Sequence, residues 1–67
     1  MPIVRVEILP GRSQETKQRI AHEMTALLAR ELQVDAQHIY VMFAETAHAD
    51  WAVGGRFFTP PTDGTTP

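Results

Sequence analysis

The feature that most constrains this chain is a long amphipathic segment between two short segments rich in β-forming apolar residues. In residues 3–9, Val4, Val6 and Ile8 share one face, which is the period of a strand with one buried side. From about Gln14 to Leu32 the apolar residues recur at helical spacing. A second strand is predicted from about His38 to Glu45. Two strands joined by a helix form a β-α-β unit, so we expect parallel strands with a right-handed crossover.

Local signals set the limits of these elements. Pro10-Gly11 interrupts the first strand, and Ser13 is a suitable N-cap for the helix. The second strand has apolar groups on both faces, which predicts a central strand covered on both sides. Farther on, the glycine pair in Trp51-Ala-Val-Gly-Gly55 indicates a tight hairpin or bulge. The expected fold class is α+β: a short β-α-β subunit over residues 1–56 with a C-terminal hairpin, followed by a Pro/Thr-rich tail at 57–67.

The chain is too small to bury a large core alone. A chain of 67 residues buries too little of its surface to be more than marginally stable alone. Small proteins usually gain the missing stability from disulfides, a structural metal or oligomerisation. Cysteine is absent, and the histidines, at positions 22, 38 and 48, do not have the spacing of metal ligands. Self-association is therefore expected, without a bound metal.

Charge and hydropathy disfavour several other classes of partner. The formal net charge is -2, and the basic residues are spread along the chain, so we expect no nucleic-acid partner. No apolar run approaches the ~20 residues that span a bilayer, and the first ten residues do not read as a signal peptide. We expect no membrane association and a cytoplasmic location.

Pro2 is the most informative candidate for chemistry. Methionine before proline is normally removed, which would leave a secondary amine directly before the first strand. An ordinary α-amino group has a pKa near ~7.7–8.0. Partial burial and a nearby arginine would both lower that pKa and keep the neutral base populated near neutral pH. Taken by itself, however, Met-Pro is a common pair of first residues and does not indicate catalysis.

Other side chains are more ambiguous alone. Arg12, between the first strand and the helix, has the planar fork that binds carboxylates, or it is a solvated loop residue. Trp51 is either the apolar wall of a pocket or a packing residue between subunits. Glu45 is either a second acid or an ordinary charge at a strand end, and the latter is favoured.

Several of these segments together resemble the 4-oxalocrotonate tautomerase family. They are the initial Met-Pro-Ile, Ile-Leu-Pro-Gly-Arg-Ser ending at Ser13, the amphipathic helix, the strand that closes with Glu45, and Trp51 to Gly55. The resemblance covers residues 2 to about 56, in order and with matching spacing. It implies a cofactor-independent keto-enol tautomerase, an isomerase. It also implies a homo-oligomer, a hexamer built as a trimer of dimers.

The resemblance also implies the roles of individual residues. Pro2 would be the general base that moves a proton between the oxygen and carbon ends of an enol acid. Arg12 would hold the carboxylate of a small substrate, and Trp51 and Leu9 would line the pocket, with the site assembled from neighbouring chains. Tyr40 stands where well-known members have a second arginine. A phenol donates one hydrogen bond without a positive charge, and loss of one such stabilising donor can cost about 10²–10³ in rate.

That departure leaves alternatives open. The open alternatives are a substrate other than 2-hydroxymuconate, a weaker promiscuous activity, or a second cation supplied by Arg5 or Arg56. A second hypothesis is that a protein of the same fold acts as a hydratase, dehalogenase or decarboxylase on small unsaturated acids. That chemistry would need a pocket carboxylate such as Glu45 or Asp50. A third is a non-catalytic oligomeric module, which the replacement at Tyr40 supports.

Overall fold

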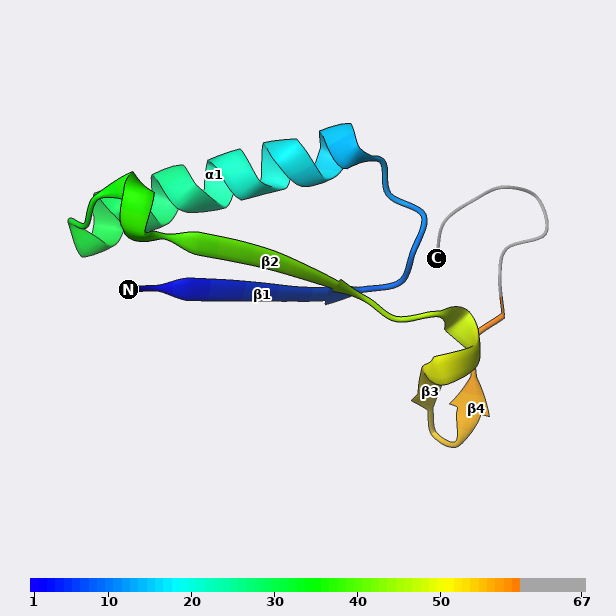
Figure 1. The fold of residues 1–67 in the computed structure, drawn as a ribbon. Helices are drawn as coiled ribbons and strands as arrows, with labels where there is room; N and C mark the ends of the chain where they lie inside the picture. Colours follow the sequence, from blue (N-terminus) through cyan, green and yellow to red (C-terminus); the bar gives the residue numbers. More distant parts are fainter. Residues whose placement is uncertain (60–67) are drawn as a thin grey trace.

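A strand, a helix and a second strand form the main body of the protein, followed by a small hairpin (Figure 1). The computed structural model describes residues 1–59. Strand β1 spans Ile3–Ile8, helix α1 spans Gln14–Leu32 and strand β2 spans Tyr40–Glu45. Strands β3 (Ala52–Val53) and β4 (Arg56–Phe57) form the hairpin. Short 3₁₀ turns occur at Ala36–His38 and His48–Asp50. The predicted β-α-β architecture and C-terminal hairpin are confirmed.

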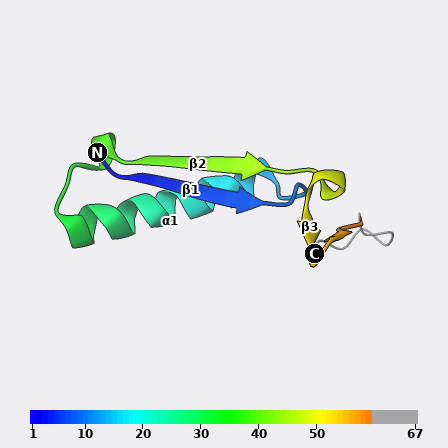
Figure 2. The same ribbon diagram turned by 90° about the horizontal axis from the view of Figure 1, so that it is seen from below.

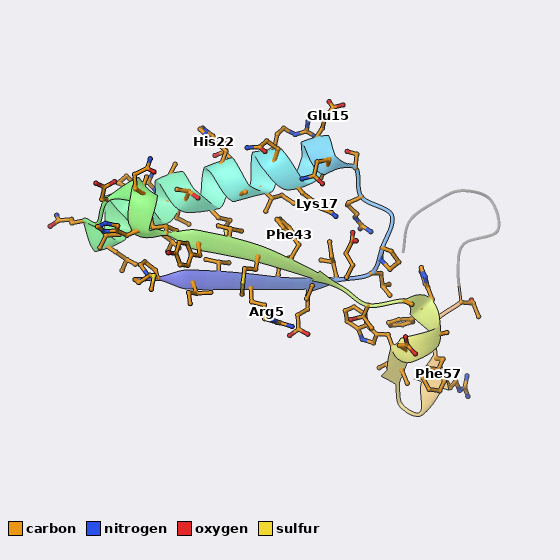
Figure 3. The ribbon with its side chains drawn as sticks, in the orientation of Figure 1. Arg5, Glu15, Lys17, His22, Phe43 and Phe57 are labelled. Carbon is orange, nitrogen blue, oxygen red and sulfur yellow. The ribbon has the colours of Figure 1, made fainter. Side chains whose placement is uncertain are left out.

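Strands β1 and β2 are parallel, as the connection through a long helix requires. Their register pairs Ile3 with Tyr40 and Ile8 with Glu45. Helix α1 lies along one face of this sheet, and the opposite face has no covering element within residues 1–59 (Figures 1 and 2). Phe43 points toward the helix and Arg5 away from it (Figure 3). The sheet therefore has one covered face and one open face in a single chain.

The N-terminus of α1 is set by its cap. Ser13 has extended backbone angles, and its side-chain oxygen accepts a hydrogen bond from the amide of Thr16 at 3.1 Å. This bond satisfies one of the amides that the first turn leaves without a partner, and Glu15 in that turn suits the positive end of the helix dipole. The predicted N-cap and helix bounds are confirmed.

Two predictions for the second strand are wrong. His38 belongs to a 3₁₀ turn, and β2 begins at Tyr40. The cause is local: the Asp35 carboxylate accepts a hydrogen bond from the amide of Gln37 at 2.9 Å and stabilises the turn. The strand is also not central within the described chain. It pairs only with β1, and Tyr40 and Met42 on its second face are 49% and 44% exposed.

The hydrophobic core is very small. Among residues 1–59, Ile39 is the only buried apolar side chain, and Ile3 and Leu32 are more than half exposed. The radius of gyration is 15.0 Å, against about 11 Å for a compact domain of this length. A single chain thus leaves apolar surface uncovered that a stable fold normally buries.

The hairpin lies beyond the carboxyl ends of β1 and β2, away from the N-terminus (Figure 1). Gly54 and Gly55 form its turn with φ values of 61° and 83°, the positive φ pair that two-residue hairpins favour. Of the predicted tail at 57–67, residues 60–67 lie outside the described part of the chain. The domain boundary at residue 56 stays a prediction.

Candidate functional site

Pro2 and Tyr40 lie together at the amino-terminal end of the sheet. The backbone amide of Tyr40 donates a hydrogen bond to the carbonyl oxygen of Pro2, with an N···O distance of 3.0 Å. This bond continues the β1–β2 ladder by one residue and fixes the start of the chain against β2. Pro2 is half-buried, whereas the side chain of Met1 projects into solvent at 79% exposure. The prediction that Pro2 is held at a strand end therefore has a direct structural cause.

Leu9, Arg12 and Trp51 lie at the opposite end of the sheet. Leu9 follows the last residue of β1, and Arg12 precedes the Ser13 cap of α1; both are half-buried. Trp51 leads into the hairpin beyond the carboxyl end of β2. At a strand rise of about 3.3 Å per residue, Pro2 and Leu9 are roughly 23 Å apart. A single chain consequently separates the five candidate residues into two clusters.

Glu45 is held in an ion pair near the second cluster. Its Oε2 lies 2.8 Å from Nζ of Lys17, which links the end of β2 to the first turns of α1. The Lys17 side chain is 18% exposed and that of Glu45 is 36% exposed. A carboxylate engaged in this way has one oxygen committed to a structural contact. The sequence did not reveal the pair, because its members come from elements distant in the chain.

The hairpin adds an aromatic contact that sequence reasoning also missed. The ring centroids of Trp51 and Phe58 are 5.9 Å apart, and the ring planes are inclined by 53°. The amide of Phe58 donates a hydrogen bond to the carbonyl oxygen of Trp51 at 2.9 Å. The available signal was the glycine pair: a two-residue turn at Gly54-Gly55 places residues 51 and 58 opposite each other.

An open cavity of about 410 Å³ lies elsewhere, on the side of α1. It is lined by Arg19, Ile20, Glu23 and Met24, and none of the candidate residues takes part.

No helix within residues 1–59 is both long and apolar enough to cross a membrane.

Comparison with known proteins gives the family. A family model described as "Tautomerase enzyme" matches residues 2–60, nearly the whole chain. The chain belongs to the tautomerase family. A probable tautomerase of Ralstonia nicotianae is 34% identical over 58 residues, covering 87% of this chain and 89% of that protein. The 2-hydroxymuconate tautomerase of Pseudomonas putida is 33% identical over 56 residues, covering 84% of this chain and 89% of that protein.

Solved structures of tautomerase-family proteins share the fold. A 4-oxalocrotonate tautomerase homologue superposes with a TM-score of 0.83 at 29% identity, covering 87% of this chain and 92% of the other. A heterohexamer 4-oxalocrotonate tautomerase from Chloroflexus aurantiacus gives a TM-score of 0.77 at 30% identity, covering 85% and 92%. The predicted resemblance to the 4-oxalocrotonate tautomerases is thereby confirmed. The roles of the individual site residues stay predictions.

Proposed function

We propose that this tautomerase-family protein moves a proton between oxygen and carbon of a small enol or keto acid, with the amine of Pro2 as general base. The observation that carries the proposal is the position of Pro2. Its carbonyl is tied to β2 through Tyr40, so the ring nitrogen directly before it has a fixed place at the sheet end. Removal of Met1 would convert that nitrogen from an amide without basic character to a secondary amine.

The proposed reaction uses one base twice. The neutral amine of Pro2 takes the proton from the enol hydroxyl of the substrate, and electrons move from the O–H bond through the enol to carbon. The protonated amine then returns the proton to that carbon and forms the C–H bond of the keto acid. Arg12 holds the carboxylate, Tyr40 donates a hydrogen bond to the oxygen that carries developing negative charge, and Leu9 and Trp51 line the pocket.

These roles require more than one chain, because Pro2 and Arg12 lie at opposite ends of β1. The edge of β1 that faces away from β2 has no partner strand within residues 1–59. An exposed edge of this kind is a template for pairing with another chain. Antiparallel pairing of two β1 strands about a two-fold axis would bring Pro2 of one copy beside Leu9 and Arg12 of the other. The site is then shared, and isolated chains lack it.

The exposed face of the sheet supports assembly beyond such a pair. Ile3, Tyr40 and Met42 are 58%, 49% and 44% exposed on the face opposite α1. A pair of chains joined through β1 would still leave these three apolar side chains exposed, beside Arg5 and Glu7 on the same face. Further copies would cover it in a homohexamer arranged as a trimer of dimers, in which the small core of each chain becomes part of a larger one.

The structure offers less support for water-activating chemistry. That alternative needs a pocket carboxylate, and Glu45 is engaged with Lys17 at 2.8 Å. Asp50 ends the turn at His48–Asp50 and is exposed. We therefore favour proton transfer over hydration, dehalogenation or decarboxylation.

The test combines kinetics with mass spectrometry. Pro2→Ala preserves the backbone carbonyl that accepts from Tyr40 and removes the secondary amine, so we expect the oligomer to persist. Turnover of phenylenolpyruvate and 2-hydroxymuconate should fall to near the uncatalysed rate. A 3-halopropynoate should add covalently to the Met1-free chain and leave any Met1-bearing chain unlabelled, which provides an internal control.

Full turnover by Pro2→Ala, or equal activity of chains that retain Met1, would refute the proposal. An active-site amine that takes up no label would favour a non-catalytic module.

A further inference from the structure

The contact between Trp51 and Phe58 belongs to the hairpin ladder. Ala52 pairs with Phe57 and Val53 pairs with Arg56, in antiparallel register. The hydrogen bond from the Phe58 amide to the Trp51 carbonyl extends the ladder by one further pair. Opposite residues in an antiparallel ladder share a face, and successive residues alternate between faces. Trp51 and Phe58 therefore lie on one face of the hairpin, and Phe57 lies on the other.

The two phenylalanines have different surroundings as a result. Phe57 is 61% exposed and lies opposite Ala52, whose side chain is a single methyl group. Phe58 is half-buried and meets the indole of Trp51 at a centroid distance of 5.9 Å. This tilted geometry falls within the range that aromatic pairs prefer. Phe58 thus restricts the orientation of the Trp51 ring, and Phe57 does not.

The pair also changes the character of the surface that Trp51 presents. A single indole presents one apolar face, whereas two rings inclined by 53° form a broader apolar surface, against which an aromatic substituent can pack in the offset or edge-to-face arrangements that rings prefer. At the other cluster Tyr40, 49% exposed, provides a phenol and no positive charge, and Arg5 on the same face lies opposite Met42, two residues farther along the strands. Both features favour a ligand with one carboxylate and one aromatic or comparably bulky apolar group.

We propose that Phe58 is a specificity-determining residue. It supports Trp51 as a two-ring wall and gives the site a preference for aryl-substituted monocarboxylic enol acids over dicarboxylic ones. This inference rests on the proposed function, because it places Trp51 in the pocket. The residue acts both through Trp51 and by extending the apolar surface, so its effect belongs to substrate discrimination more than to proton transfer.

Trp51 is the sole tryptophan of the chain, so intrinsic fluorescence reports on this position directly. The assembled protein is titrated with trans-cinnamate, an unreactive aryl monocarboxylate, and with fumarate, a dicarboxylate. Phe58→Ala should shift the Trp51 emission and weaken cinnamate binding by roughly three- to tenfold, the effect expected for loss of an aromatic pair. Fumarate binding should change less than twofold. Phe57→Ala, the matched control, should leave both affinities within twofold of the unaltered protein.

Kinetics give a second readout. In Phe58→Ala the kcat/KM ratio of phenylenolpyruvate to 2-hydroxymuconate should fall by the same roughly three- to tenfold factor, mainly through KM. Phe58→Leu retains apolar volume without a ring, and it should give an intermediate ratio even where Phe58→Ala fails to assemble. An unchanged ratio and unchanged cinnamate affinity in Phe58→Leu, or an equal loss in Phe57→Ala, would overturn the inference. The proposed function fails separately, through undiminished turnover by Pro2→Ala.

Discussion

The amide of Tyr40 donates a hydrogen bond to the carbonyl oxygen of Pro2 at 3.0 Å, so the start of β2 holds the start of β1. The same residue that fixes the backbone of Pro2 also carries a phenol on the exposed face of the sheet. The backbone contact is independent of the side chain at position 40. Substitutions there consequently test the phenol while leaving the attachment of Pro2 intact.

Tyr40→Phe removes the phenolic donor and little else. If that hydroxyl stabilises negative charge on the substrate oxygen, kcat/KM should fall by roughly ten- to a hundredfold, the cost of one hydrogen bond to a charged group. Tyr40→Arg should raise turnover of 2-hydroxymuconate relative to phenylenolpyruvate, because a guanidinium supplies the missing positive charge. Met42→Leu, on the same sheet face, is the control and should keep the original ratio. Steady-state rates that do not change in Tyr40→Phe would remove Tyr40 from the site.

Arg12→Ala tests the proposed carboxylate contact. We expect KM to rise by roughly ten- to a hundredfold for either substrate, since a charge-assisted interaction with the carboxylate is lost. Arg30→Ala is a suitable control: Arg30 lies in the last turn of α1 and pairs with Glu31 at 3.0 Å. Initial rates over a range of substrate concentrations separate KM from kcat. Equal KM values in the two variants would contradict the assignment.

Met42→Glu tests assembly through the open face of the sheet. A carboxylate placed between chains at this position would lose its hydration, and Arg5, which lies opposite Met42 in the register, would offset only part of that cost, so the oligomer should weaken or dissociate and activity should fall with it. His22→Glu introduces the same side chain on the outer surface of α1, where His22 points away from the sheet (Figure 3), and should leave the assembly intact. Size-exclusion chromatography with light scattering gives the mass of each. A Met42→Glu variant that keeps the full oligomeric mass would rule out this face as an interface.

Ser13→Ala tests the local origin of the helix. Loss of the bond to the Thr16 amide should destabilise the folded chain by about 1 kcal/mol, and Ser13→Asp should restore most of it because aspartate is also a good N-cap. Gln18→Ala, at an exposed position within α1, should have little effect. Urea unfolding must be followed at one fixed protein concentration, because assembly contributes to stability. Coincident unfolding curves for Ser13→Ala and the unaltered chain would show that the cap contributes nothing measurable.

Local chemistry explains which structural predictions succeeded. The bounds of α1, the Ser13 cap and the turn at Gly54-Gly55 depend on contacts within a few residues, and sequence spacing predicts them well. The predicted start of the second strand at His38 was wrong for an equally local reason. The Asp35 side chain stabilises a turn that the alternation of apolar residues does not reveal. The apolar pattern on both faces of β2 predicts a central, covered strand, but within residues 1–59 β2 pairs only with β1 and its second face is exposed.

The sequence by itself determined the β-α-β order, the helix and its cap, and Pro2 and Arg12 as the residues of greatest chemical interest. Only the tertiary structure decided that the Tyr40 amide donates to the Pro2 carbonyl and that Lys17 binds Glu45. The physical reason is the range of the interactions. Helix caps and turns are governed by neighbouring residues, whereas register and ion pairs between elements depend on how the whole chain packs.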